Sequence, residues 1–168
     1  MKKIAIIILV LFTCIVALSI IYRENILDIV ENTKIQKYGE PINKESGLIN
    51  NGYFGIDNTG NETDAMGNRN AINEAIEYAY KNNIKEIAFE KGTYVIDSEK
   101  DSKQYHYHEK GIILKDNISI DLNGSIIKHI QNDKPCYVLF SVIDCNNVEI
   151  KNGILLGEKN EHIYSDEH

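Results

Sequence analysis

The chain has 168 residues, of which 18 are basic and 25 are acidic, so its formal net charge is -7. This length leaves room for one domain of ordinary size. Binding to a nucleic-acid backbone needs clustered lysines and arginines, and no basic stripe occurs in the chain, so the composition argues against a nucleic-acid partner.

The N-terminus carries an uncharged apolar run. Lys2 and Lys3 precede 19 residues without a charge, at positions 4–22. A membrane-spanning helix needs about 20 apolar residues and a signal-peptide core about 7 to 15. The small residues at 17 and 19 also fit a signal-peptidase site. Residues 1–22 are therefore interpreted as a signal peptide or, if uncleaved, a membrane anchor. Both alternatives place the rest of the chain outside the cytoplasm, because the lysines favour the inner side.

Residues 23–51 mix charges with scattered isoleucines and contain a proline and a glycine, so they are expected to form a linker. The domain is expected over residues 52–168. Its first part, residues 53–64, is rich in Gly, Asn, Asp and Thr, which favour turns. The carboxylates in this part lack the spacing of an EF-hand loop, so no metal site is predicted there.

One amphipathic helix is predicted over residues 70–82. Its apolar stripe at helical spacing consists of Ala71, Ile72, Ala75, Ile76, Ala79 and Tyr80. Asn73 is expected to face water. Asn68 or Asn70 is expected to cap the helix start, and the asparagine pair at 82–83 to close its end in a left-handed conformation. Such a helix can cover the open end of a stack of strands.

A strand followed by a glycine turn occurs twice, as NISIDLNGSII at residues 117–127 and as NVEIKNGILL at residues 147–156. A looser copy, EIAFEKGTYVI, occupies residues 86–96. Self-similarity at an interval of about 30 residues predicts a solenoid, in which each repeat forms one coil. The inward side chains are expected to be Ile118, Ile120 and either Ile126 or Ile127.

The turn, helix and strand motifs follow one another in a particular order along the chain. They are Phe54-Gly55, Gly60, Thr63-Asp64, the helix repeat, Ile87-Ala88-Phe89, Gly92-Thr93-Tyr94, Gly111-Ile112-Ile113-Leu114 and the two Asn-Gly repeats. The ordered set resembles the opening of the pectate lyase superfamily domain, the group that includes rhamnogalacturonase-like and epimerase-like proteins. The similarity covers roughly residues 53–157. Lys91 departs from the pattern, because a proline is common there, and the six residues before the helix are more than the family usually has.

The resemblance implies an all-β solenoid, namely a right-handed parallel β-helix with an N-terminal capping α-helix. At this length we expect about three coils and hence an incomplete β-helix. A β-sandwich also has alternating strands with glycine turns, but its strands recur every 8 to 12 residues or so, and the longer interval here favours the β-helix.

Two polar segments are candidates for contact with a substrate. Residues 98–110 are hydrophilic and are expected to leave the coil, where tyrosines could stack on sugar rings. Residues 157–168 place carboxylates beside histidines, with a solvated tail as the alternative. The candidates for substrate binding are Tyr105, Tyr107, Glu161 and His162. His106 and His108 could form a metal pair if extended, but a solvated loop is the preferred interpretation.

The resemblance implies an extracytoplasmic protein that acts on polysaccharide or another glycan, as a lyase, glycoside hydrolase or epimerase. In this family the catalytic residues and the calcium ligands of the lyases come from later coils. The Asn-Thr-Asp-Gly motif of the polygalacturonases is absent from the chain, as is a comparable lyase motif. No catalytic residue is therefore assigned and no cofactor is identified, although the resemblance implies that the intact family fold can hold calcium.

The chain is accordingly interpreted as the N-terminal part of a larger β-helix protein. Two alternatives stay open: a non-catalytic carbohydrate-binding or adhesive surface module, and an inactive structural fragment. In each case the open end of the solenoid is a surface through which an oligomer could form.

Overall fold

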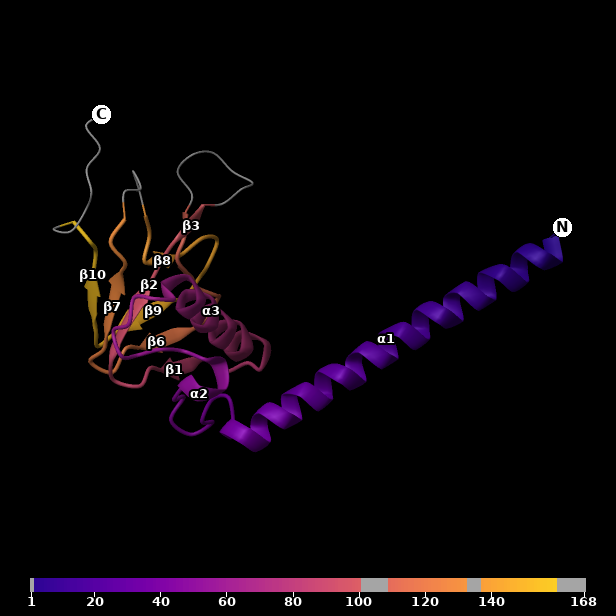
Figure 1. The fold of residues 1–168 in the computed structure, drawn as a ribbon, viewed down its shortest axis with the longest axis horizontal. Helices are drawn as coiled ribbons and strands as arrows, with labels where there is room; N and C mark the ends of the chain where they lie inside the picture. The colour runs from indigo at the N-terminus through magenta and orange to yellow at the C-terminus, as the bar shows by residue number, and fades with distance from the viewer. Residues whose placement is uncertain (1, 101–108, 133–136, 160–168) are drawn as a thin grey trace, which may run out of the picture. The chain divides into compact units, whose positions relative to one another are not determined.

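The computed structural model describes residues 2–100, 109–132 and 137–159 (Figure 1). Two compact units are present, Met1–Gly39 and Glu40–His168. The helices are α1 (Lys2–Tyr38), α2 (Asn51–Phe54) and α3 (Ala65–Lys81). The strands are β1 (Glu86–Ala88), β2 (Thr93–Ile96), β3 (Glu99–Lys100), β4 (Glu109–Lys110), β5 (Ile112–Ile113), β6 (Ser119–Asp121), β7 (Ile126–His129), β8 (Phe140–Ser141), β9 (Glu149–Lys151) and β10 (Ile154–Leu156).

The first unit is the single helix α1, which is 37 residues long. Many of its large apolar side chains are exposed, among them Phe12, Leu18 and Ile29. In the part of the chain that the structure describes, no helix has both the length and the apolar character to cross a membrane. The signal peptide or anchor at residues 1–22 stays a prediction.

The expected linker of residues 23–51 takes two different structures. Its first part continues α1 as far as Tyr38, and its second part belongs to the second unit. Ile42 and Ile49 are buried there and form an antiparallel bridge. Gly47 has a φ of 71°, and a Cβ at this position would lie 2.4 Å from the carbonyl oxygen of Glu86. Residues 40–50 therefore pack against β1 as part of the domain.

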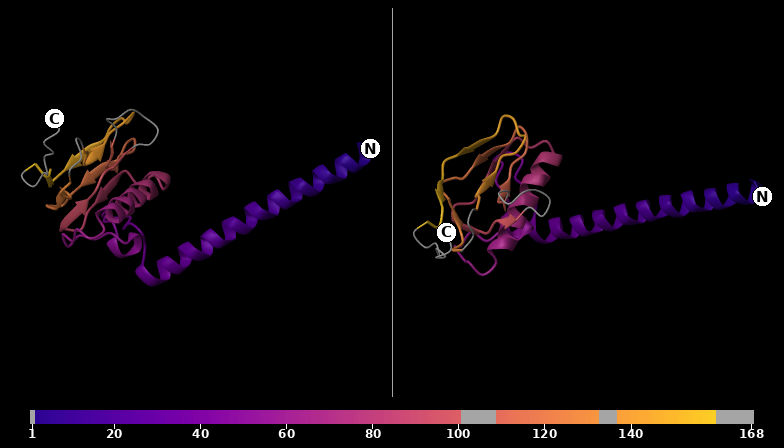
Figure 2. Two further views of the ribbon diagram at one scale, coloured as in Figure 1. Left: turned by 45° about the horizontal axis from the view of Figure 1, so that its top comes forward. Right: turned by 90° about the horizontal axis from the view of Figure 1, so that it is seen from above.

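The second unit is a parallel-strand fold with a helix. One three-stranded sheet has the order β1-β6-β9, a second has the order β10-β7-β2, and β5 pairs with β8. All of these pairs are parallel, whereas the short pair β3 and β4 is antiparallel. Figure 2 shows successive passages of the chain lying one beside the next, from β1 and β2 through β6 and β7 to β9 and β10.

The register repeats at nearly constant sequence intervals. Ile87 of β1 lies opposite Ile120 of β6, which lies opposite Ile150 of β9. In the second sheet Tyr94 lies opposite Ile127, which lies opposite Leu155. Each passage of the chain therefore places equivalent residues above one another in two sheets.

Asparagines at the turns explain why the two Asn-Gly repeats look alike. Asn117 and Asn147 precede β6 and β9 with φ values of 58° and 54°, a left-handed conformation that asparagine tolerates better than most residues. The side-chain amide of Asn147 donates to Oδ1 of Asn117 at 2.9 Å. Asn123 and Asn152 repeat the left-handed conformation after the same two strands. The repeated asparagines therefore turn the chain at equivalent points, and the side chains of Asn117 and Asn147 bond to one another between passages.

The core lies between the sheets and α3. Ile118 and Ile120 are buried, as predicted, and of the two alternatives on β7 it is Ile127 that is fully buried. Burial decreases toward the last passage. Ile150 is only half-buried, and all three residues of β10 are exposed.

Helix α3 begins five residues earlier than predicted. Its N-cap is Asp64, whose carboxylate accepts from the backbone N–H of Gly67 at 2.9 Å. Asn68 lies inside the helix and is buried, where its amide group bonds to Asp57 and Val95. The end agrees with prediction, because Asn83 has a φ of 57°. The apolar stripe is buried apart from Tyr80.

The helix also supplies hydrogen bonds to the edge of β5. The amide of Asn73 donates to the carbonyl of Gly111 at 3.3 Å and accepts from the N–H of Ile113 at 2.7 Å. The guanidinium of Arg69 donates to the carbonyl of Lys110 at 2.8 Å. The expectation that Asn73 faces water is therefore wrong, because its side chain makes backbone hydrogen bonds of the kind that a neighbouring strand would make.

Candidate functional site

Polar residues of three successive passages lie where the strands of one sheet end. Asp97 and Ser98 follow β2, His129 is the last residue of β7, and Glu158 follows β10 by two positions. Because these strands are parallel neighbours, their carboxyl ends lie along the same edge of the sheet (Figure 1). We call Asp97, Ser98, His129 and Glu158 the strand-end cluster.

Both ring nitrogens of His129 take part in hydrogen bonds. Nδ1 lies 2.8 Å from the carbonyl oxygen of Ile130, and Nε2 lies 3.2 Å from the backbone nitrogen of Ser98 and 3.1 Å from its Oγ. A carbonyl can only accept and a backbone N–H can only donate, so these two contacts favour a proton on Nδ1, whereas the Asn132 amide nitrogen, 3.1 Å from Nδ1, favours a lone pair there. The carboxylate of Asp97 approaches Nε2 to 3.7 Å.

An aromatic side chain links His129 to the last passage. The ring of Tyr137 packs against the imidazole with centroids 4.3 Å apart at an interplanar angle of 38°. The Tyr137 hydroxyl accepts from the backbone N–H of Glu158 at 3.0 Å. Glu158 is itself buried. Polar contacts thus join Asp97, Ser98 and His129 across two passages, and Tyr137 connects His129 to the backbone of the third.

A serine hydroxyl beside a neutral imidazole nitrogen is the arrangement in which histidine activates a nucleophile. Here Ser98 and His129 are both fully buried. The N–H of Ser98 lies 3.2 Å from Nε2, the atom that would accept the hydroxyl proton, and also donates to Oδ1 of Asp97 at 2.8 Å. In this conformation the pair stabilises the strand ends and is closed to a polymeric substrate.

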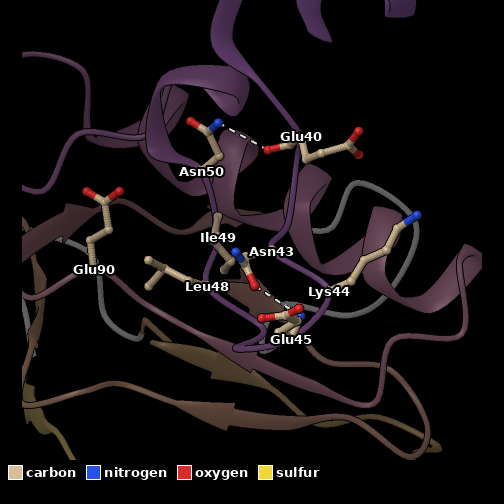
Figure 3. Close-up of a pocket in the computed structure, with 8 residues that line it drawn as sticks. All are labelled: Glu40, Asn43, Lys44, Glu45, Leu48, Ile49, Asn50 and Glu90. Carbon is tan, nitrogen blue, oxygen red and sulfur yellow. Dashed lines mark hydrogen bonds between the residues drawn. The ribbon is translucent and has the colours of Figure 1, made fainter.

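A surface pocket of about 710 Å³ lies near residues 40–50 (Figure 3). Its lining residues are Glu40, Asn43, Lys44, Glu45, Leu48, Ile49, Asn50 and Glu90. The carboxylates of Glu40, Glu45 and Glu90 lie at separate positions around it and do not converge (Figure 3).

Tyr94 bonds to Glu90, one of the residues that line this pocket. Its hydroxyl donates to the backbone carbonyl of Glu90 and accepts from the amide of Asn51 at 3.4 Å. The amide of Asn51 also donates to Oε2 of Glu90 at 3.3 Å. Burial raises the pKa of the Tyr94 hydroxyl. The phenol is therefore neutral at physiological pH and acts as a hydrogen-bonding support for Glu90.

The substrate-binding candidates from the sequence lie outside the described residues. Tyr105 and Tyr107 fall within residues 101–108, and Glu161 and His162 fall within residues 160–168. His106 and His108 share the first of these segments. Among the residues that the structure does describe, no group of three or more His, Cys, Asp or Glu side chains is placed to hold a metal ion.

Sequence reasoning missed Ser98 and His129. Neither belongs to a recognisable motif, and 31 positions separate them. That separation is close to the interval of the strand repeat, since Ile96 lies opposite His129 in the register of β2 and β7. Aligning the passages by register would have brought the two residues together.

Comparison with known proteins adds one relative. Over 120 residues, or 70% of this chain, the sequence is 30% identical to the uncharacterized protein YclG of Bacillus subtilis (strain 168). The match covers 20% of that protein, so the chain spans about a fifth of the length of the curated relative it matches. No family model matches the sequence. No solved structure matches it either.

Proposed function

We propose that the chain forms the capped first coils of a right-handed parallel β-helix protein, similar to the pectate lyase superfamily, that acts on polysaccharide outside the cytoplasm. The observation that carries this proposal is the repeated register. Leu48, β1, β6 and β9 follow one another across one sheet, while Thr59, β2, β7 and β10 follow one another across the second. Consecutive passages that visit the same sheets in the same order are what a β-helix requires.

Two further features support the proposed architecture. Connections between parallel strands of one sheet are right-handed in nearly all proteins, which favours the right-handed form. The side chains of Asn73 and Arg69 bond to the backbone beside β5, as expected for a helix that caps the first coil.

The proposed action on polysaccharide rests on the family resemblance and on the placement of polar groups. The strand-end cluster lies directly beside residues 101–108 and 160–168 along the chain, and these segments contain Tyr105, Tyr107, Glu161 and His162. Side chains that leave successive coils at the same edge can contact successive sugar units of a polymer. We assign no catalytic residue to this chain. In the proposed whole protein, a lyase, hydrolase or epimerase, catalysis belongs to later coils.

The test is incubation of the full chain, and of a longer protein that contains it, with polygalacturonate, alginate and host-surface glycans. Unsaturated products or new reducing ends from the longer protein, together with glycan binding by the chain alone, are the expected result. Binding by both proteins without turnover would instead identify the alternative, a non-catalytic carbohydrate-binding or adhesive module. If neither protein binds or converts any glycan, the proposal is wrong.

A further inference from the structure

Asn51, a buried residue next to the surface pocket, has a side-chain oxygen without a hydrogen-bond donor. The residue is only 8% exposed, and its amide nitrogen donates to Oε2 of Glu90 and to the hydroxyl of Tyr94. Within the part of the chain that the structure describes, no donor reaches its Oδ1. Leaving a buried acceptor without a donor is unfavourable, and such atoms are rare in native proteins. A donor from outside the chain would remove this deficit.

The orientation of the Asn51 amide follows from its neighbours. The Tyr94 hydroxyl gives its proton to the backbone carbonyl of Glu90, and the Glu90 carboxylate can only accept. The nitrogen of the amide therefore faces both groups, because an oxygen in its place would meet two further acceptors. Turning the amide over would thus not satisfy Oδ1.

A single donor atom can reach both the Asn51 oxygen and the Glu90 carboxylate, which lines the pocket. Oδ1 and Nδ2 of Asn51 share a carbon atom, and Nδ2 lies 3.3 Å from Glu90 Oε2. A primary ammonium has several N–H donors, and its charge is opposite to that of the carboxylate, so it can donate to both acceptors. A hydroxyl has a single proton and cannot donate to both.

The rest of the pocket also favours a cation. Three glutamates and one lysine line it, so its formal net charge is -2. Glu40 and Glu45 lie apart from Glu90 (Figure 3), so the carboxylates surround the pocket and together attract a cation that enters it. The volume of about 710 Å³ is larger than an amine alone needs, and Leu48 and Ile49 supply apolar contact for the carbon atoms of a ligand.

Buried side chains hold Glu90 in position. Its backbone carbonyl accepts from the hydroxyls of Tyr94 and Ser125, and both of these residues are fully buried. Its carboxylate accepts from Asn51. A carboxylate that is positioned in advance loses less conformational freedom when a ligand binds, so the arrangement favours recognition at this point.

We propose that the pocket binds a primary ammonium group, which donates to the carboxylate of Glu90 and to Oδ1 of Asn51. The two bonds of the Asn51 amide, at 3.3 Å and 3.4 Å, are long for hydrogen bonds, so a small rotation of this side chain can bring Oδ1 to the ligand. Amino sugars and polyamines both carry such a group. The proposal concerns binding alone and does not depend on action on polysaccharide, so its test is independent of the proposed function.

The test is isothermal titration calorimetry of the full chain at low salt with a glucosamine tetramer, its N-acetylated counterpart, a galacturonate tetramer and spermidine. The first two probes differ at the amine, which is charged in one and a neutral amide in the other. We expect an amine probe to bind roughly tenfold or more tightly than the acetylated tetramer, and the galacturonate tetramer not to bind. Binding of the glucosamine tetramer without spermidine would assign the site to an amino sugar, and the reverse to a polyamine. If neither amine binds, or if the acetylated tetramer binds equally well, the proposal is wrong.

Substitutions show whether the amine binds at this pocket. Glu90→Gln keeps the shape of the side chain and removes its charge, and it is expected to weaken binding roughly tenfold. Asn51→Leu removes Oδ1 and is expected to weaken binding roughly fivefold. Glu74→Gln makes the same change in net charge on α3, outside the pocket, and is expected to bind like the parent.

Circular dichroism of each variant checks that the fold is retained. Glu45→Gln, which lowers the negative charge of the lining without touching Asn51, is expected to weaken binding roughly threefold and keeps the test valid if another variant is less stable. Binding by Glu90→Gln or Asn51→Leu that equals binding by the parent would overturn the proposal, as would equal weakening by the control Glu74→Gln.

Discussion

Two adjacent isoleucines of β7 offer a sharp test of which face of the strand packs into the core. Ile127 is fully buried between Tyr94 and Leu155, whereas Ile126, its neighbour in sequence, is half-buried on the opposite face. Ile→Ala removes three carbons at either position. At about 0.8 kcal/mol for each buried carbon, full burial of Ile127 corresponds to about 2.4 kcal/mol before the cavity is counted. Because Tyr94 is held in the core and cannot fill the space completely, we expect a total loss of about 3 kcal/mol for Ile127→Ala.

Ile126→Ala is the matched control, because it carries the same change in β-propensity on the same central strand. We expect it to lower stability by about 1 kcal/mol or less. The assay is urea denaturation followed by circular dichroism, with the free energy of unfolding taken by linear extrapolation. Equal losses for the two variants, or a larger loss for Ile126→Ala, would refute the assigned inward face of β7.

Three further predictions concern other contacts. Ile120→Asp buries an unpaired charge between the sheets, and far-UV circular dichroism is expected to show an unfolded domain. A variant as stable as the parent would show that Ile120 does not face the core. Asn73→Ala leaves two backbone groups beside β5 without their side-chain partner and is expected to lower the unfolding free energy by about 2 kcal/mol, measured in urea. Asp121 accepts from the N–H of Asn123 and the amide of Asn152, which lowers the pKa of its carboxyl below the usual 3.8. The Asp121 carboxylate therefore stabilises the fold above pH 3.8. We expect Asp121→Asn to have a lower free energy of unfolding than the parent at pH 7, and urea denaturation is expected to show this difference shrinking as the pH falls below 3.8.

The strand repeat could be predicted because its signals are local. In residues 117–127, alternation places Ile118 and Ile120 on one face, and the turn residues Asn123 and Gly124 both have positive φ. These features depend only on neighbouring residues, so the sequence carries them. Between Ile126 and Ile127 alternation alone could not decide, because the turn between the strands sets which of them faces inward.

The start of α3 could not be predicted because distant contacts determine it. Gly67 and Asn68 are poor helix formers, which favoured a later start. In the structure Asn68 bonds to Asp57 and Val95, which lie outside the helix, and these bonds stabilise it inside the first turns. The same reason applies to Asn73, whose partners lie about 40 residues further along.

The candidate site likewise contains residues that the local sequence can suggest and residues that only the register of the strands brings together. The proposed sugar contacts were chosen from local composition, and residues 101–108 and 160–168 lie outside the described part of the chain. The strand-end cluster depends on register, which brings Ser98 and His129 together across two passages. Local composition contains no trace of such a pairing.

Because Asn73 and Arg69 bond to the backbone beside β5, one end of the stack of passages is closed by helix side chains. A strand edge whose backbone groups are already bonded by helix side chains offers no template for another strand, so passages can be added only on the side of β8, β9 and β10. Duplication of a unit of about 30 residues, by evolution or by a protein engineer, would thus extend the molecule at that side and leave α3 in place. Because each passage contacts chiefly its neighbours, we expect a copy of residues 117–146 inserted after residue 146 to lengthen the stack without rebuilding its first layer.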